Sequence, residues 1–443
     1  MRELKQTRRS VVRERAVLVE VIVDSGDRPE GHRDRLEELG RLADSAGAEV
    51  VATLTQRRKG IHPSTYIGHG KVEELAALVK EERAQVVIFD SDLSPAQLRN
   101  LEKAIDCKAI DRSELILDIF AARARTLEAR LQVELAQLEY ILPRLKQMWS
   151  HLSRMEGGGI ATRGPGETQL ESDRRIARKR ITDLKHRLAE IDARKEREVR
   201  SRGAALTVGL VGYTNAGKSS LLNALTGSDA YVADKLFATL DTRTRAWRLP
   251  HHLTALLSDT VGFIRDLPHH LVASFKATLE EAVHADLLLH VVDVSTAHVA
   301  ADMDAVRAVL AEIGCSDKPQ LVVLNKADLV DDPMHLDLVQ RRLPESAAVS
   351  AKTGLGLEDL TRRVTERLAG PLREISIRAS AGDGRLLAWI EQHATVLERR
   401  VDDGDLVQTV RLPERLVGEI QKFKVQSSRF KVQGSEFKVK DEA

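Results

Sequence analysis

The fold is decided by the stretch Gly212-Tyr213-Thr214-Asn215-Ala216-Gly217-Lys218-Ser219-Ser220, which has the form G-x-x-x-x-G-K-[ST] of a phosphate-binding loop. The apolar run 208–211 before it predicts a buried strand, and residues 220–225 after it predict the start of a helix. Glycines let backbone N–H groups approach phosphate oxygens, and the positive end of the helix dipole adds to the attraction. This arrangement predicts a bound phosphate without saying which nucleotide carries it.

Four further segments follow in the order that GTPases have. They are Phe237-Ala238-Thr239-Leu240-Asp241 in a polar stretch, Ser258-Asp259-Thr260-Val261-Gly262 after a strand, Asn325-Lys326-Ala327-Asp328 after the apolar run 321–324, and Ser350-Ala351-Lys352. Alone, the third also fits a lysine-capped turn, and the fourth carries little information. All five segments in this order predict a domain that binds GTP or GDP.

Asp328, the last residue of the N-K-x-D motif, predicts the base. Its carboxylate would accept hydrogen bonds from N1–H and from the exocyclic amine of guanine. Adenine has neither donor at these positions, so it would leave a buried carboxylate without partners, which is strongly unfavourable. The nucleotide is therefore expected to carry guanine.

The same motifs predict which groups handle the phosphates and a Mg²⁺ ion. Lys218 is expected to neutralise charge on the β- and γ-phosphates, and the Gly262 amide to sense the γ-phosphate. Ser219 and Thr239 are expected to bind Mg²⁺ directly, and Asp259 through a coordinated water. We therefore predict Lys218, Thr239 and Gly262 as the catalytic residues.

Phe263 follows Gly262 at the position where Ras-like enzymes have a glutamine that orients the attacking water. Phenylalanine cannot hydrogen-bond a water, so intrinsic hydrolysis is expected to be slow unless a partner or a bound cation supplies the missing group. Asn215 bears on the second option, because the pattern G-x-x-N-x-G-K-S resembles that of potassium-activated GTPases. One hypothesis is that Asn215 helps to hold K⁺; the other is that it only shapes the loop.

Composition indicates a globular protein of several domains: 443 residues, 42% hydrophobic and 30% charged. The net charge of +1 implies no partner for the chain as a whole. Cys107 and Cys315 lie too far apart in the sequence to suggest a disulfide framework or a metal site. With no secretory segment and no apolar run long enough to span a bilayer, we expect a cytoplasmic protein without a membrane span.

Periodicity predicts an N-terminal α/β domain over 1–112 and a helical hairpin over 113–204. In the first, strands are expected at 16–23, 50–54 and 86–89, alternating with helices at 32–46, 70–83 and 94–105, which favours a parallel sheet. In the second, two long antiparallel helices are expected to pack through apolar side chains spaced three and four apart. Pro143 is expected to bend or interrupt the first helix, and the glycine-rich segment 157–166 to lie outside both. The apolar side chains are Leu131, Leu135, Leu138, Leu142, Leu145, Ile181, Leu184, Leu188 and Ile191.

The rest of the chain is expected to form a nucleotide domain, a small α/β domain and a tail. Strands at 206–211, 254–258, 286–293 and 320–324 predict a mostly parallel sheet with helices on both faces over 205–370. Residues 371–422 form the small domain. Residues 423–443 contain a nearly exact tandem repeat in which each copy starts with Phe-Lys-Val, at Phe423, Phe430 and Phe437. An adhesive strand repeat is one interpretation, but we expect an appended flexible extension and assign it no function.

From about residue 15 to 422 the sequence resembles the HflX family, translational GTPases related to Obg. The motifs that carry the resemblance are Gly68-His69-Gly70-Lys71, Gly164-Pro165-Gly166-Glu167-Thr168-Gln169-Leu170-Glu171, Asp173-Arg174-Arg175, Leu236-Phe237-Ala238-Thr239-Leu240-Asp241 and Asp259-Thr260-Val261-Gly262-Phe263-Ile264. A hydrophobic residue after the D-x-x-G glycine is usual in that family. The terminal repeat departs from the family pattern.

The resemblance implies a protein that binds the large ribosomal subunit through its N-terminal domain and hairpin and splits stalled or idle ribosomes when GTP is bound. We also expect the protein to be a monomer. The second hairpin helix is rich in cations, which suits a phosphate backbone. A solvated face paired to nearby glutamates is the alternative. Aromatic residues make up only 3%, so shape and phosphate contacts are expected to dominate over base stacking. The cations are Arg174, Arg175, Arg178, Lys179, Arg180, Lys185, Arg187, Arg194, Lys195 and Arg197.

Three alternatives remain open from the sequence. A regulatory GTP-dependent protein-binding module with little turnover is the main rival to a hydrolase. A tRNA-modifying GTPase would share Asn215, but no cysteine or cofactor motif accompanies it. The segment Gly68-His69-Gly70-Lys71 before a helix would also suit ATP phosphates, although a tight turn explains it equally well.

Overall fold

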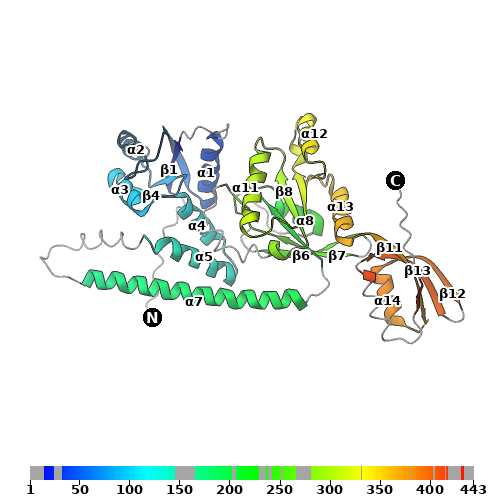
Figure 1. The fold of residues 1–443 in the computed structure, drawn as a ribbon. Helices are drawn as coiled ribbons and strands as arrows, with labels where there is room; N and C mark the ends of the chain where they lie inside the picture. Colours follow the sequence, from blue (N-terminus) through cyan, green and yellow to red (C-terminus); the bar gives the residue numbers. More distant parts are fainter. Residues whose placement is uncertain are drawn as a thin grey trace.

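The computed structural model describes residues 14–23, 32–144, 165–201, 206–228, 236–237, 242–250, 253–265, 281–330, 332–380, 382–402, 405–414, 416–417 and 431–433. Within these residues the strands form three separate sheets that follow one another along the chain. Figure 1 shows them as an N-terminal unit, a central unit and a C-terminal unit, with one long helix below the first two. The expected α/β class is confirmed.

The N-terminal sheet is fully parallel, with strand order β2-β1-β3-β4. Side chains of β1 alternate between two apolar clusters, because successive residues of a strand point to opposite faces. Helix α1 covers one face and α2 and α3 the other. The three expected strands are confirmed, and a fourth, β4, is too short to show a period. The bounds are β1(Arg15–Val23), α1(His32–Ala46), β2(Glu49–Arg58), α2(His69–Glu81), β3(Val86–Phe89), α3(Pro95–Ile105) and β4(Lys108–Ile110).

The helical hairpin consists of α5(Leu127–Ile141) and α7(Pro165–Ser201), preceded by α4(Arg112–Arg123), which packs in the N-terminal core. Leu131 and Leu135 of α5 contact Leu184 and Leu188 of α7, as the spacing predicts. Leu138, Ile181 and Ile191 pack against this cluster. Leu142 only caps α5, and Leu145 lies outside the described residues.

Two prolines mark where the hairpin helices end and begin. Helix α5 ends at Ile141, two residues before Pro143, so the expected interruption is confirmed. Helix α7 begins at Pro165, so the expectation that the glycine-rich segment stays non-helical through Gly166 is wrong for its last two residues. Proline suits a first helical position because its fixed φ is helical and its missing N–H would have had no helical partner. Residues 157–164 lie outside the described residues.

The central sheet has the order β10-β9-β8-β5-β7-β6 and is parallel except for β6, which pairs antiparallel with β7. Helices α8 and α13 contribute to the apolar cluster on one face, and α11 to the cluster on the other. The predicted mostly parallel sheet with helices on both faces is confirmed. The bounds are β5(Leu206–Gly212), α8(Lys218–Thr226), β6(Arg243–Arg248), β7(Thr254–Asp259), β8(Leu287–Asp293), α11(Val299–Glu312), β9(Gln320–Asn325), α12(Pro333–Arg342), β10(Ala347–Ala348) and α13(Leu357–Ala369).

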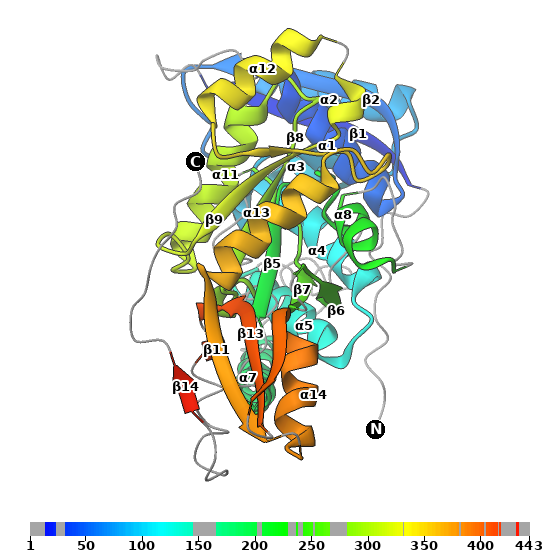
Figure 2. The same cartoon turned by 90° about the vertical axis from the view of Figure 1, so that its right-hand side faces the viewer.

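The C-terminal sheet is antiparallel, with order β12-β13-β11-β14, and α14 packs on one face (Figure 2). Its strand β14(Lys431–Gln433) belongs to the terminal repeat, where a flexible extension is expected. These three residues instead pair with β11, because the edge of that sheet offers unpaired backbone groups. The other bounds are β11(Leu372–Ser380), α14(Gly384–His393), β12(Thr395–Asp402) and β13(Asp405–Pro413).

In the part of the chain that the structure describes, no helix combines the length and apolar character needed to cross a membrane.

Candidate nucleotide site

The phosphate loop joins β5 to α8 and requires glycine where other elements approach it. Gly217 has φ +89, and a Cβ there would lie 2.2 Å from the Asn325 side-chain nitrogen. Gly212 has φ +156, and a Cβ there would lie 2.2 Å from the Val291 carbonyl oxygen on β8. Asn215 has φ 61, a left-handed conformation that asparagine tolerates better than most residues. The loop is therefore shaped by its contacts with β8 and with the N-K-x-D segment.

Lys218 is held across the loop by the backbone. Its Nζ donates hydrogen bonds of 2.9 Å to the carbonyl oxygens of Gly212 and Tyr213. Burial lowers its pKa to about 8, and the nearby Asp259 carboxylate opposes that shift. A bound phosphate would raise this pKa and so favour the charged amine. The two hydrogen bonds to the loop already hold the amine where it can neutralise phosphate oxygens.

Ser219 and Asp259 form the part of the expected Mg²⁺ site that the structure describes. The Ser219 hydroxyl donates to the Asp259 carboxylate over 2.5 Å at the end of β7, where Asp259 is fully buried. A hydroxyl and a carboxylate oxygen side by side fit the oxygen ligands that Mg²⁺ prefers. Thr239, the other expected ligand, lies outside the described residues, as do Ala238, Leu240 and Asp241.

Asn325 ties the base-recognition segment to the phosphate loop. Its side-chain nitrogen donates to the Ala216 carbonyl over 2.8 Å, and its oxygen accepts from the Ala351 amide over 3.1 Å. Lys326 pairs with Asp293 over 2.7 Å. The hydrogen bonds of Asn325 therefore bring three segments distant in sequence to one place.

A cavity of about 860 Å³ opens between these segments. Asp328 is exposed at this cavity, where a guanine could reach its carboxylate. Ser350 does not line it, and its hydroxyl instead accepts from the Thr353 amide. The predicted binding residues at this cavity are Asn215, Gly217, Ser220, Asn325, Lys326, Asp328, Ala351 and Lys352.

The D-x-x-G segment is attached to the phosphate loop through its backbone. The Phe263 amide donates to Gly212 over 3.1 Å, and the Thr214 amide donates to the Phe263 carbonyl over 2.7 Å. The Phe263 side chain is 2% exposed and lies in an apolar cluster with Val211 and Leu288, against which Tyr213 of the loop also packs. This buried, apolar side chain cannot orient a water at the phosphate, which agrees with the prediction from the sequence.

Phe237 does not lie in the nucleotide site, although the sequence analysis includes it among the GTP-binding residues. It is 2% exposed, and its ring meets that of Phe120 on α4 at 4.7 Å between centroids. Leu236, Val261 and Ile264 belong to the same apolar cluster. Hydrophobic burial against the N-terminal unit therefore decides the position of Phe237, which sequence patterning does not reveal.

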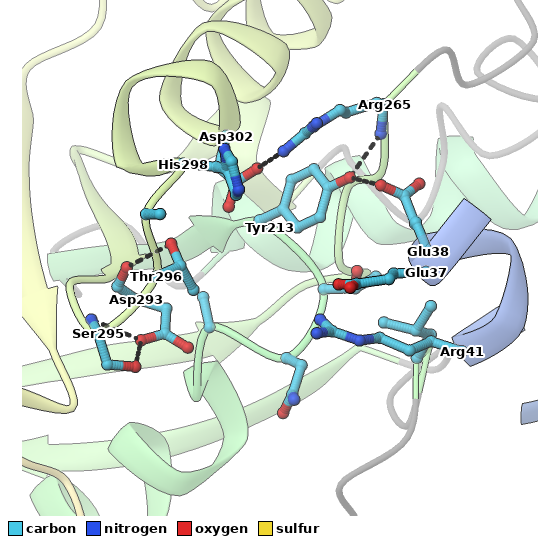
Figure 3. A pocket seen from close by; sticks show the side chains of 15 residues that line it. Glu37, Glu38, Arg41, Tyr213, Arg265, Asp293, Ser295, Thr296, His298 and Asp302 are labelled. Atoms are coloured by element: carbon cyan, nitrogen blue, oxygen red, sulfur yellow. Dashed lines mark hydrogen bonds and ion pairs between the residues drawn. The ribbon is translucent and has the colours of Figure 1, made fainter. Parts of the chain in front are cut away.

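A polar network missed by the sequence analysis joins the two units at Tyr213 (Figure 3). The Tyr213 hydroxyl donates to Glu38 of α1 over 2.5 Å and accepts from the Arg265 amide over 3.0 Å. Burial and the Glu38 carboxylate raise the pKa of Tyr213, so its phenol stays protonated and remains a donor. Arg112 pairs with Glu38 and Asp90 and donates to the Arg265 carbonyl over 3.1 Å. The network fixes the N-terminal unit beside the phosphate loop.

A second cavity, of about 340 Å³, lies at this junction. Figure 3 shows Glu37, Glu38 and Arg41 of α1 on one side and Ser295, Thr296 and His298 of the central unit on the other. Thr214 and Asn215 of the phosphate loop also line it, together with Leu236 and Arg265. The outer side of the phosphate loop therefore faces a partly open cavity with both polar and apolar lining.

Comparison with known families accounts for most of the chain. Four family models match, described as GTP-binding GTPase N-terminal, GTP-binding GTPase Middle Region, 50S ribosome-binding GTPase and HflX C-terminal domain. The matched residues are 33–121, 123–202, 207–326 and 337–428. GTPase HflX of Escherichia coli is 45% identical over 404 residues, which cover 90% of this chain and 94% of that protein. The chain belongs to the HflX family of GTPases.

Other HflX relatives match over similar lengths. GTPase HflX of Caldanaerobacter subterraneus is 45% identical, covering 88% of this chain and 89% of its own. That of Lacrimispora saccharolytica is 48% identical, covering 92% and 96%. Among solved structures, a GTP-binding protein of Sulfolobus solfataricus in complex with GDP is 26% identical, with a TM-score of 0.43, and covers 80% of this chain and 98% of its own.

The site of this HflX-family GTPase thus contains motif residues and residues that only the contact between the two units brings to it. The motif residues were predictable because each occupies a fixed place relative to one strand of the central sheet. Glu38, Arg112 and Arg265 belong to no motif, and only the contact between the units reveals them. A sequence clue existed in Tyr213, a large side chain inside a loop that otherwise holds small ones.

Proposed function

We propose that this GTPase uses Mg²⁺ to hydrolyse GTP and couples its nucleotide state to binding of the large ribosomal subunit, splitting stalled or idle ribosomes. The observation that carries the proposal is the packing of Leu236, Phe237, Val261 and Ile264, which lie in or next to the nucleotide motifs, within the N-terminal core. A change in these segments on GTP binding would act directly on the unit that bears the hairpin. The match to the family described as 50S ribosome-binding GTPase supports the partner.

Most of the predicted chemical roles fall to residues that the structure describes. Lys218 neutralises phosphate charge, and Asp328 selects guanine. Ser219 and Asp259 would hold Mg²⁺, which when bound supplies positive charge at the β- and γ-phosphate oxygens. Phe263 contributes only its backbone, so the side chain usual for orienting water is absent and turnover without a partner is slow.

The surface of α7 supports an RNA partner. Arg180 and Lys185 pair with Glu134 and Glu139 of α5, so part of the basic face is neutralised. Arg175, Arg178, Lys179 and Arg187 are exposed and make no ion pair with any residue that the structure describes. Exposed cations along one helix attract a phosphate backbone.

Pelleting with large subunits, in the presence of a GTP analogue or GDP, tests the partner. We expect Arg178→Glu with Lys179→Glu to lose binding and to lower the slope of log affinity against log salt by about 1–2. Arg385→Glu with Arg400→Glu changes the net charge equally at exposed sites of the C-terminal unit and should bind normally. Equal binding by both double variants would contradict RNA contact through α7.

Hydrolysis with and without large subunits separates the proposal from a regulatory module with little turnover. Stimulation by the subunits is expected. If the protein does not pellet with ribosomes and they do not raise its hydrolysis rate, the ribosomal role is contradicted. The proposal of GTP hydrolysis is then unaffected.

Potassium dependence is a further expected outcome, because Asn215 lies in the phosphate loop and lines both cavities. If Asn215 helps to hold K⁺, replacing Na⁺ by K⁺ at equal ionic strength should raise the hydrolysis rate several-fold. The Asn215→Ala variant should lose this difference while still binding GDP. Equal rates of the unaltered protein in the two salts would show that Asn215 only shapes the loop.

A further inference from the structure

The hydroxyl of Thr214 is a buried polar group without a partner. Thr214 is 5% exposed, and its Oγ1 forms no hydrogen bond with any residue that the structure describes. Leaving such a group unsatisfied costs about 1–3 kcal/mol, so native proteins rarely do so without a reason. Thr214 also lines the cavity between the units. A ligand atom that enters this part of the site would satisfy the hydroxyl.

The position of Thr214 identifies that ligand atom. A Cβ built on Gly262 would lie 2.8 Å from Thr214 Cγ2 and 3.1 Å from Lys218 Nζ. The methyl group of Thr214 and the Lys218 amine therefore lie in close contact with Gly262. In a phosphate loop the lysine reaches the β- and γ-phosphates, and the D-x-x-G glycine meets the γ-phosphate. Because Oγ1 is bonded to the same carbon as that methyl group, we expect the Thr214 hydroxyl to lie beside the terminal phosphate of bound GTP.

The polar side chains of Lys218, which lies close to Gly262, and of the adjacent Ser219 already form hydrogen bonds within the protein. Lys218 binds two carbonyl oxygens of the loop, and Ser219 donates to Asp259. Phe263 lies in the apolar cluster beside α11, and its backbone is bonded to Gly212 and Thr214. Thr214 thus offers a hydroxyl where the residue after Gly262 offers none.

We propose that Thr214 is a catalytic residue of GTP hydrolysis, its hydroxyl accepting a hydrogen bond from the attacking water and donating one to a γ-phosphate oxygen. The water oxygen forms a bond to the γ-phosphorus while the bond from phosphorus to the bridging oxygen breaks. GDP leaves with that electron pair, and the proton of the water passes to a γ-phosphate oxygen. The cavity that Thr214 lines has room for a water molecule. The proposal rests on GTP hydrolysis and is independent of ribosome binding.

The variants Thr214→Val and Thr214→Ser separate the hydroxyl from the shape of the side chain. Valine keeps the branched carbon that contacts Gly262 and removes the oxygen; serine keeps the oxygen. In single-turnover hydrolysis by the full chain without ribosomes, T214V should be slower by about 10–100-fold, as when one hydrogen bond to a transition state is lost. T214S should stay within about threefold of the unaltered protein, since it retains the bond.

Affinity and stability measurements exclude a merely structural role. T214V should bind GDP and a GTP analogue normally, and its nucleotide-free form should be at least as stable to heat, because the unsatisfied hydroxyl is gone. Hydrolysis by T214V at the original rate would overturn the proposal. So would slow hydrolysis by T214S equal to that of T214V, or a T214V defect confined to nucleotide affinity. Loss of ribosome binding alone would bear on the proposed partner and not on Thr214.

Discussion

Replacing Asp328 by asparagine is expected to weaken GTP binding by about 10²–10⁴-fold, because two hydrogen bonds to a carboxylate, each about 1.5–3 kcal/mol, are lost. Asp328 is exposed at the cavity that Asn325 helps to form, so the substitution need not disturb the fold. Competition against a fluorescent GDP analogue measures the loss.

The same variant should gain affinity for xanthosine triphosphate. Xanthine keeps the N1–H of guanine and has a carbonyl in place of the exocyclic amine. An asparagine at position 328 can accept from N1–H and donate to that carbonyl, so hydrogen bonding is restored with the donor and acceptor exchanged. A matched control is Asp332→Asn, whose carboxylate caps α12 outside the cavity and should leave both affinities unchanged. Unaltered preference for GTP in Asp328→Asn would show that this residue does not contact the base.

The nucleotide motifs were predictable because their geometry is local. A buried strand that ends in Gly212, followed by a helix from Lys218, leaves the chain between them little freedom. Asn325 follows β9 in the same way, and parallel strands place their carboxyl ends at one edge of a sheet. Local sequence therefore determined where these residues meet.

Phe237 and Glu38 show where that logic stops. Phe237 lies beside polar motif residues in the sequence, but burial against Phe120 determines its position. Glu38 meets Tyr213 across a sequence separation of 175 residues. Such contacts depend on how two units pack, and neither residue periodicity nor motif spacing predicts that packing. Strand β6 was missed for a related reason: as an edge strand it buries only Trp247 and otherwise looks like a polar loop.

Arg112→Met is expected to destabilise the protein by about 3–5 kcal/mol, which is the usual cost of removing one partner from a buried ion pair. Arg112 is 4% exposed and holds the carboxylates of Asp90 and Glu38 together. It also donates to the Arg265 carbonyl next to the D-x-x-G segment. Without the guanidinium, the two carboxylates remain buried close to each other and repel. Urea unfolding at neutral pH measures the loss.

The pH dependence of that loss has a definite sign. Burial already raises the pKa of Asp90, and Arg112 opposes the shift. Removing Arg112 raises that pKa further, so Asp90 is protonated at a higher pH in the folded variant than in the unfolded chain. A carboxyl group of this kind costs stability above its folded pKa; the cost falls as pH drops below that value and is gone below the unfolded pKa. The difference in stability between Arg112→Met and the unaltered protein should therefore shrink on acidification. A difference that stays constant with pH would show that lost packing, and not the uncompensated charge, dominates.

Neutralising the partners provides the matched control for Arg112→Met. Adding Asp90→Asn and Glu38→Gln removes both buried charges, so the triple variant should recover part of the lost stability despite having more substitutions. Arg112→Lys keeps the charge but cannot reach three acceptors in a planar fork, and it should lie between the two. If the triple variant were no more stable than Arg112→Met, the ion pairs would not be what stabilises this junction. The loss of stability in Arg112→Met would then come from the shape of the guanidinium and its hydrogen bond to the Arg265 carbonyl.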